Sequence, residues 1–413
     1  MSPRPAREDP ADTVRRLRGW LDDPAAISRA EERGVIPGAV LARLAEEGLL
    51  APELPPELGG AGLPPSGLGV LCEEFGRTWM SLLSVLTVHG MSLAAVHRWA
   101  TGERAENLLK AAARGSLLLS FALSEPEVGS DANAVTTRAT PVPGGYRVSG
   151  VKTWLSGGQL ADAFLTFAAS PDGAVALLIP RDTAGVRVEP ITGMLGFRAA
   201  MLARLELEDC FVPATALVGR PGFGISHVAA TALDHGRYRL AWGGVGLAQA
   251  CLDASARHTA ERTQFGVVLA QHQLVRRHLT EMTVRTAAAR ELARRAGSLR
   301  DAGEPDALLC TTMAKYLAAD TAATCARDAV QLHGAQGCRQ GAVVERCFRD
   351  AKILEIIEGT AEIHQATIAD HVRRATTTGA GTGSWPASVL PPVLPPVLPP
   401  VLPSEPIRKA AEP

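Results

Sequence analysis

The sequence lacks an excess of charge of either sign. It contains 42 Lys and Arg against 43 Asp and Glu, so the formal net charge of its 413 residues is −1. Domains that bind nucleic acids usually carry a basic excess, and disordered chains combine high net charge with few apolar residues. Since 46% of the residues are hydrophobic, the composition indicates neither class. It favours two or three domains with a substantial buried core and no nucleic-acid partner.

Long apolar runs and paired cysteines are also missing. No apolar run approaches the roughly 18–20 residues of a membrane helix, and residues 1–10 lack the apolar core of a secretory signal. The seven cysteines are scattered, and none forms a Cys-x-x-Cys pair. This spacing argues against a zinc site or a disulfide framework and for a reducing compartment. We therefore expect a cytoplasmic protein without a membrane span or a metal site.

The hydrophobic pattern divides the chain into four segments. Residues 1–115 have helical periodicity, residues 116–225 change to short strand-like runs, and residues 226–375 return to long helical segments. The tail, residues 376–413, contains a Thr/Gly-rich stretch and four Val-Leu-Pro units, which predict a disordered, proline-rich segment. We expect a helical domain, a β domain, a helical bundle and a tail, in that order.

Glycine and proline mark the expected breaks within these segments. The helices of the first segment should break near Gly90 and Gly102. In the second segment, Pro-Gly-Gly at 143–145 predicts the turn of a β-hairpin.

The strongest candidate for chemistry lies between Arg349 and Thr360. Its apolar residues fall on one helical face, so it predicts a helix that ends at Gly359, with Thr360 as the N-cap of the next helix. Glu358 would then lie beside the partial negative charge of a helix C-terminus. A carboxylate placed there should have a raised pKa, which suits a proton-abstracting base. The alternative is a solvated glutamate without a chemical role, since charged residues are mostly exposed.

Two further stretches follow predicted strands. Residues 121–131, Phe-Ala-Leu-Ser-Glu-Pro-Glu-Val-Gly-Ser-Asp, run from a strand into a loop whose amides and hydroxyls can approach a planar ligand. Residues 151–158 contain Trp154 and Ser156 before two glycines. An ordinary strand-to-turn transition and a core tryptophan are the alternatives.

Two helical stretches carry candidate binding residues. Arg262 opens Arg-Thr-Gln-Phe-Gly, and a guanidinium fork matches the oxygens of a pyrophosphate. Asp234 and Arg237 lie three residues apart, hence on one helical face. A solvated arginine and a structural ion pair are the respective alternatives.

In the same order, these motifs resemble those of the acyl-CoA dehydrogenase family over roughly residues 35–372. The C-terminal signature, Arg-Asp-Ala-Lys followed by Ile-Glu-Gly-Thr, is similar, as are Glu-Pro-x-x-Gly-Ser-Asp and Arg-x-x-Phe-Gly. The resemblance implies an α+β multi-domain fold with an N-terminal helical domain, a central β-barrel-like domain and a C-terminal four-helix bundle. It also implies that Glu358 removes the α-proton of an acyl thioester while FAD takes a hydride from the β-carbon. Some relatives carry the base at the position of Gly236, so Glu358 remains as the base here.

The resemblance further assigns the binding residues. Arg262, Gln264 and Gln273 would reach the FAD of a neighbouring subunit, which implies a homodimer or a homotetramer. Gln331 and Gly334 would lie on the adenine side. The full cofactor set that it implies is Leu123, Ser124, Ser130, Trp154, Ser156, Arg262, Gln264, Phe265, Gln273, Gln331, Gly334, Thr360 and Glu362. The substrate set is Ser130, Asp234, Arg237 and Gly359.

Within the family, residues 194–203, 218–224 and 232–238 look like the branch that serves polyketide and peptide-antibiotic pathways. That resemblance implies a substrate held by an acyl carrier protein, in the making of a methoxymalonyl-type extender unit. The first alternative is an acyl-CoA dehydrogenase of fatty-acid or amino-acid breakdown. The second is a flavin-free binding protein that retained the fold. The sequence does not identify the electron acceptor.

Overall fold

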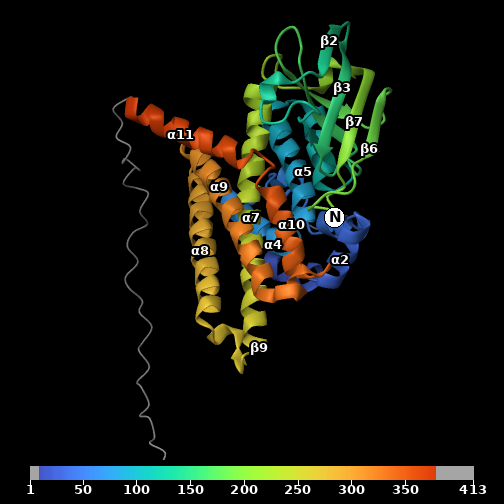
Figure 1. Cartoon of the computed structure of the whole chain (residues 1–413). Coiled ribbons are helices and arrows are strands. Elements are labelled where there is room, and N and C mark those ends of the chain that lie inside the picture. Colours follow the sequence, from blue (N-terminus) through green and yellow to red (C-terminus); the bar gives the residue numbers. More distant parts are fainter. Residues whose placement is uncertain (1–8, 378–413) are drawn as a thin grey trace, which may run out of the picture. The chain divides into compact units, whose positions relative to one another are not determined.

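The computed structural model describes residues 9–377 (Figure 1). The disordered tail predicted for residues 376–413 lies outside this range, apart from residues 376 and 377, which end helix α11 (Ala361–Thr377). The chain divides into two units, residues 1–365 and residues 366–413. All of the fold and the site described below belongs to the first unit.

The N-terminal part is helical, and prolines start several of its helices. Asp23 caps one of them, because its side chain accepts hydrogen bonds from the amides of Ala25 and Ala26. The predicted break at Gly90 is wrong, since the helix continues there and the missing side chain leaves room for the guanidinium of Arg239. The break before Gly102 is confirmed. The helices are α1 (Pro10–Leu21), α2 (Pro24–Arg33), α3 (Gly38–Glu46), α4 (Pro65–Thr78), α5 (Met80–Trp99) and α6 (Glu103–Ala113).

Helix α5 corrects the expectation that no stretch could cross a membrane. By length and composition it is such a stretch, with a mean hydropathy of 1.4 in its most apolar window. However, 94% of that window is buried inside the protein. Its hydrophobicity therefore reflects its central position in the first unit, where α7 and the β domain cover it.

The β domain consists of two four-stranded sheets. One has the order β1-β4-β5-β8, with β1 (Leu119–Ala122) parallel to β4 (Ala163–Ala168) and antiparallel pairing elsewhere. The other has the order β2-β3-β7-β6, and the predicted hairpin turn joins β2 to β3, with Val142 opposite Gly145. Apolar residues of both sheets form one shared core. The remaining strands are β2 (Arg138–Val142), β3 (Gly145–Leu155), β5 (Val175–Pro180), β6 (Val186–Pro190), β7 (Ala203–Pro213) and β8 (Leu217–Val218).

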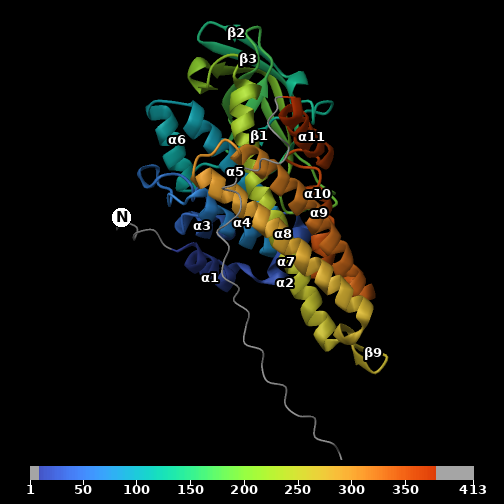
Figure 2. The same ribbon diagram turned by 90° about the vertical axis from the view of Figure 1, so that its left-hand side faces the viewer.

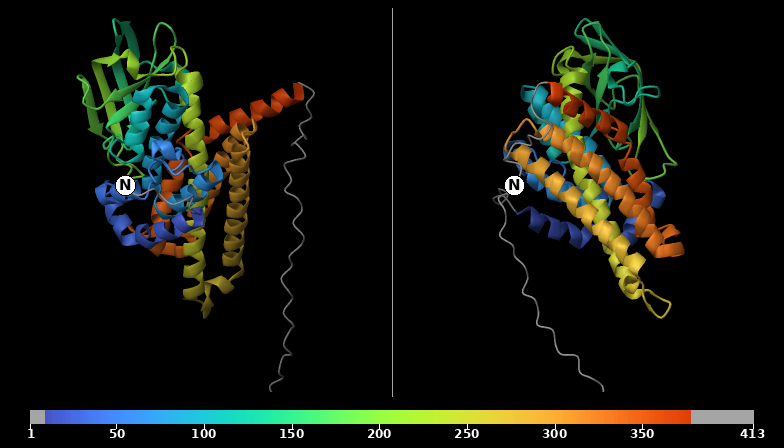
Figure 3. Two further views of the ribbon diagram at one scale, coloured as in Figure 1. Left: turned by 180° about the vertical axis from the view of Figure 1, so that it is seen from behind. Right: turned by 60° about the vertical axis from the view of Figure 1, so that its left-hand side comes forward.

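Long helices form the C-terminal bundle. Helices α7 (Ala230–Glu261), α8 (Gln273–Asp301) and α9 (Ala307–His333) run side by side, and α10 (Val343–Leu354) packs on α7 and α9 (Figure 2). Gly246 of α7 and Gly76 of α4 allow the two helices to approach closely, since a Cβ at either position would meet the backbone of the other helix. The β domain lies at one end of α7, and the short hairpin of β9 (Thr263–Gln264) and β10 (Val267–Val268) lies at the other (Figure 3).

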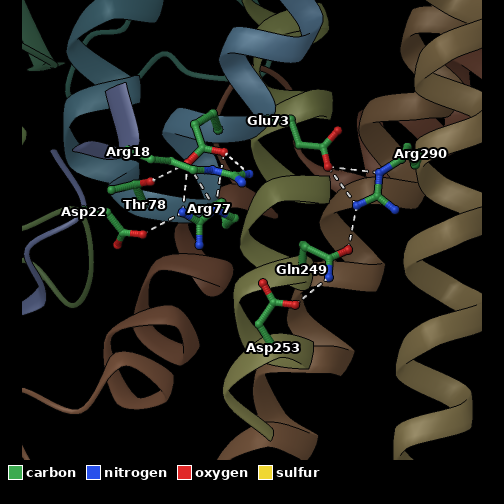
Figure 4. A network of polar contacts seen from close by, with 9 residues as sticks. Arg18, Asp22, Glu73, Arg77, Thr78, Gln249, Asp253 and Arg290 are labelled. Carbon is green, nitrogen blue, oxygen red and sulfur yellow. Dashed lines mark hydrogen bonds and ion pairs between the residues drawn. The ribbon is translucent and has the colours of Figure 1, made fainter. Parts of the chain in front are cut away.

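A charged network joins the N-terminal helices to this bundle (Figure 4). On α4, Glu74 accepts hydrogen bonds from Arg18 at 2.7 Å and Arg77 at 2.9 Å. The neighbouring Glu73 accepts from Arg290 of α8 at 2.8 Å. The two arginines hold the pKa of Glu74 below its usual value although burial acts to raise it. Helix α4 is therefore tied by charge to α1 on one side and to α8 on the other.

Candidate active site

A cavity of about 630 Å³ opens where α5, the β domain, α7 and the segment after α10 meet. This volume lies within the usual range for small-molecule sites. The residues that line it come from α5, the loop after β1, the end of β3, residues 194–202, α7 and the turn that follows α10. The sequence segments that carry the predicted chemistry are thus brought together from distant parts of the chain.

Glu358 lies in a tight turn in the cavity wall. Helix α10 ends at Leu354, so the predicted helix end at Gly359 is wrong, because residues 355–359 form a turn instead. Within it, Glu358 and Gly359 have positive φ angles of 56° and 95°. The predicted cap at Thr360 is confirmed, since its hydroxyl accepts from the amide of Ile363 at 3.4 Å. The turn directs Glu358 toward α7 and α5.

The carboxylate of Glu358 is buried and lacks a polar partner on one oxygen. Its Oε2 atom has no hydrogen bond among the described residues. Burial raises the pKa of Glu358 from 4.5 to about 7, while the positive charges of Arg237 and Lys315 act to lower it. The raised pKa expected from the sequence therefore arises from loss of hydration on burial, and α10 ends at Leu354, before Glu358.

Gly236 of α7 provides the space for this carboxylate. A Cβ atom at position 236 would lie 2.6 Å from Oε2 of Glu358 and 2.6 Å from Sδ of Met91. Such distances are far below van der Waals contact. Any side chain at 236 would therefore displace Glu358 from its present position.

The loop after β1 and the end of β3 form another wall of the cavity. Trp154 has a left-handed φ of 63° at an irregularity of the β3–β7 pairing and is 56% exposed, which is unusual for a residue that is mostly buried in proteins. The hydroxyl of Ser156 lies 2.9 Å from that of Ser84 on α5. Of the predicted residues, those that line the cavity are Leu123, Ser124, Ser130, Trp154, Ser156, Arg237, Glu358, Gly359 and Thr360.

A buried ion pair supports this wall. Nζ of Lys152 donates to Oε1 of Glu125 at 2.7 Å and to the carbonyl of Leu123 at 3.0 Å. Glu125 also accepts from the amides of Thr136 and Thr137 at 2.7 and 2.9 Å. These donors lower the pKa of Glu125 to about 2 against the effect of burial. The network holds the loop and strand in register, and sequence reasoning assigned neither charged residue a role.

Other predicted residues lie away from the cavity. Phe265 is 95% exposed in the hairpin beyond α7, near Arg262, Gln264 and Gln273. Arg237 lies on α7, and Arg262 follows directly after the end of this helix, 25 residues later. At a rise of 1.5 Å per residue, the two residues are about 37 Å apart along the helix axis. Arg262 therefore cannot reach the cavity of its own chain. Gln331 and Gly334 lie at the end of α9, where His333 stacks on His258 of α7 at 4.3 Å.

Two predicted residues have other surroundings than expected. Asp234 does not line the cavity, and its carboxylate pairs with Arg300 of α8 at 2.5 Å. Its place beside the substrate stays a prediction. Since Arg300 comes from a helix 66 residues away, this partner could not be foreseen locally. Glu362 is exposed in the first turn of α11 and does not line the cavity either.

Sequence reasoning missed Lys315 on α9. Its side chain is buried, and Nζ donates to the carbonyls of Leu354 at 3.0 Å and Gly359 at 2.9 Å. A signal was present, because Lys315 occupies the same helical face as the small residues Thr311, Ala318 and Ala322. A lysine on such a face must find a buried partner.

Sequence profiles of acyl-CoA dehydrogenase domains match the chain in three consecutive parts. The profile of the N-terminal domain matches residues 10–116, that of the middle domain residues 120–210, and that of the C-terminal domain residues 224–373.

Individual proteins agree with these profiles. The chain is 35% identical to acryloyl-CoA reductase (NADH) of Anaerotignum propionicum, over 82% of this chain and 88% of that protein. It is 32% identical to the mitochondrial short-chain specific acyl-CoA dehydrogenase of Mus musculus, over 84% and 85%. Among solved structures it is similar to FkbI, which serves biosynthesis of the methoxymalonyl extender unit of the FK520 polyketide. The identity is 33% and the TM-score is 0.80, over 89% of this chain and 99% of FkbI.

Proposed function

Because the chain belongs to the acyl-CoA dehydrogenase family, we propose that Glu358 is the base of its FAD-dependent oxidation of an acyl thioester. The observation that carries this proposal is the buried carboxylate in the cavity, with an unpartnered Oε2 and a pKa of about 7. A general base works best when its pKa lies near the working pH. Glu358 accepts the α-proton, and Gly236 leaves its carboxylate free to do so.

The family identity makes the protein an FAD-dependent oxidoreductase acting on CH–CH groups, rather than a flavin-free binding protein. When bound, FAD supplies the acceptor for the hydride that leaves the β-carbon. The wall that contains Trp154 fits such a group, since its exposed indole offers a planar apolar face. We assign the hydroxyls of Ser124, Ser130 and Ser156 to the polar edge of the flavin.

We assign the distant residues to the FAD of a neighbouring subunit. The roughly 37 Å from Arg237 to Arg262 along α7 separates the arginine from its own cavity. A guanidinium is well suited to bind a pyrophosphate. In this proposal Arg262, Gln264, Phe265 and Gln273 act in trans, with Gln331 and Gly334 on the adenine side, and the site is complete only in a homo-oligomer.

For the substrate, we propose an acyl group carried by an acyl carrier protein, in the making of a methoxymalonyl-type extender unit. The similarity to FkbI supports this choice. The similarity to the short-chain dehydrogenase favours the second candidate, an acyl-CoA dehydrogenase of catabolism. Both candidates require the same base and the same flavin wall, so they differ in the acyl group and in what carries the thioester.

Replacing Glu358 tests the base. Glu358→Gln should keep its FAD but lose substrate-driven flavin reduction by roughly 10²–10⁴-fold, the usual effect of removing a general base. Glu291→Gln is the control, because Glu291 is exposed on α8, does not line the cavity and pairs with Arg294. Stopped-flow absorbance at the flavin bands measures the rate. Near-normal reduction by Glu358→Gln would contradict the assignment.

A comparison of carriers tests the substrate. The same acyl group is offered on an acyl carrier protein and on CoA, with an artificial electron acceptor. We expect faster turnover on the carrier protein and a loss of that advantage as salt screens the docking surfaces over the ~8–10 Å Debye length. Equal or faster turnover of the CoA ester would favour the catabolic dehydrogenase.

A further inference from the structure

Two cations, the buried Lys315 and the half-buried Arg237, hold the turn that carries Glu358. From α9, Lys315, 1% exposed, donates Nζ to the carbonyl of Gly359 at 2.9 Å and to that of Leu354 at 3.0 Å. From α7, Nε of Arg237 donates to the carbonyl of Glu358 at 3.2 Å. Two consecutive carbonyls of the turn thus point at two positive charges from different helices.

The turn needs such support because of its backbone conformation. Glu358 has a φ of 56°, which residues other than glycine seldom adopt, and Gly359 follows with a φ of 95°. Lys315 bonds both to the carbonyl of Leu354, the last residue of α10, and to that of Gly359 in the turn. One side chain therefore links the two ends of the segment 354–359. Loss of this amine would free both ends of the turn.

We propose that Lys315 is a positioning residue for the reaction: it fixes the turn that presents Glu358 and supplies a buried positive charge that favours the ionised carboxylate. The proposal rests on the assignment of Glu358 as the base, given above. Lys315 does not line the cavity, so it acts through Glu358 rather than on the substrate.

Lys315 and Arg237 are the positive charges that act on the Glu358 carboxylate. Helix α5 presents the thioether of Met91, and α7 presents Arg237 beside Gly236. From α11, the ring of His364 lies against Gly359, and burial lowers its pKa to about 3, so it is neutral at working pH. The negative charge of Glu355 acts to raise the pKa of Lys315.

The charge of Lys315 is present at neutral pH. Burial, with a smaller contribution from Arg237, lowers the pKa of Lys315 to about 8, although Glu358 and Glu355 act to raise it. In return, Lys315 and Arg237 lower the pKa of Glu358 against the effect of burial. Without the lysine, the pKa of Glu358 would rise above about 7, and less of the carboxylate would be ionised at neutral pH.

Three variants separate charge from hydrogen bonding. Lys315→Met removes both, Lys315→Gln keeps an N–H donor without charge, and Lys315→Arg keeps the charge. Arg346→Met is the matched control, since Arg346 is also buried and donates to a backbone carbonyl, that of Thr78 at 3.1 Å, but does not line the cavity.

The readouts are the pH dependence of flavin reduction and an infrared titration of the Glu358 carboxyl in the holoenzyme without substrate. The infrared band is assigned by its absence in Glu358→Gln. In Lys315→Met and Lys315→Gln we expect both curves to move up by about one pH unit, with a roughly five-fold lower rate at pH 7. Lys315→Arg should stay close to the wild type, and Arg346→Met should lose thermal stability without a shift.

The outcomes distinguish this inference from the proposed function. If Lys315→Met leaves both curves in place, the inference is wrong, whatever Glu358 does. If Glu358→Gln still reduces its flavin normally, the proposed base is wrong, and the infrared titration still decides whether Lys315 acts on Glu358. If Lys315→Met does not fold, the comparison of the Gln and Arg variants decides, and equal shifts in these two would overturn a role for the charge.

Discussion

At the scale of single residues, the position of Glu358 depends on neighbours that take no part in proton transfer. Gly236 leaves room for the carboxylate, and Met91 closes that space from α5. Arg237 and Lys315 hold the two carbonyls of the turn. A base that is buried and strained in this way needs each of these contacts, so small changes around it should have large effects on the reaction.

The first prediction concerns Gly236→Ala. The added Cβ would lie 2.6 Å from Oε2 of Glu358, so the carboxylate must move. We expect a roughly 10²-fold loss of flavin reduction, because misplacement by about 1 Å can have that effect. Gly69→Ala is the control, since its Cβ would meet the indole of Trp242, far along the chain from the base, and should affect thermal stability only. An unchanged reduction rate in Gly236→Ala would show that the space is not needed.

At the scale of elements, the position of the flavin-facing wall depends on strand β3 and the loop after β1. The Lys152–Glu125 pair joins them, and both side chains are almost fully buried. The depressed pKa of Glu125, about 2, means that its stabilising contribution is complete above its ordinary value of 4.5. The contribution is lost as the pH falls from 4.5 toward 2.

The second prediction follows from breaking this pair. Lys152→Met leaves Glu125 as a buried charge without its cation, which should destabilise the protein by about 3–5 kcal/mol at pH 7. The pKa of Glu125 should then rise toward or above its ordinary value of 4.5, so the variant should lose less further stability than the wild type as the pH falls below 4.5. FAD retention should fall too, since the carbonyl of Leu123 loses its donor. Urea unfolding between pH 3 and pH 7 measures the effect.

The control for this prediction lies on the same strand. Arg147 of β3 pairs with Asp209 at 3.3 Å, but both side chains are largely exposed. Arg147→Met should therefore change the stability by no more than about 1 kcal/mol. If the two variants behaved alike, the buried pair would not be what holds the wall.

At the scale of the whole molecule, the proposed site needs a second copy of the chain. The residues assigned to the pyrophosphate lie beyond one end of α7, about 37 Å from the cavity wall that the same helix provides. An exposed Phe265 beside them offers apolar surface for a neighbouring subunit.

The third prediction tests this arrangement by mixing subunits. Arg262→Ala should lose FAD, and Glu358→Gln should be inactive with FAD bound. In a random mixture of dimers, one site in four combines an intact Glu358 with an intact Arg262 from its partner, so about a quarter of the wild-type activity should return. A double variant with both changes on one chain, mixed with the wild type, controls for subunit exchange. Verified exchange without recovery would place Arg262 and Glu358 in the same site of one chain.

Local patterns in the sequence determined the order of the structural parts. Periodicity predicted helices, then strands, then long helices, because each pattern reflects how side chains of one element face the core. The Pro-Gly turn of the β2–β3 hairpin and the cap at Thr360 were also predictable, since both depend on a few adjacent residues. Motif resemblance added the family and FAD, and pointed to Glu358.

Only the tertiary structure decided the surroundings of these residues. Helix α5 continues through Gly90, where the absent side chain leaves space for the guanidinium of Arg239. Asp234 pairs with Arg300 and does not line the cavity. The pKa of Glu358 rises through burial beside α5 and α7, whereas the sequence indicated only the nearest helix end. Lys315, 43 positions before Glu358, meets its turn only after α9 and α10 have packed. Hydration and long-range charge depend on which distant segments come together, and no local pattern contains that information.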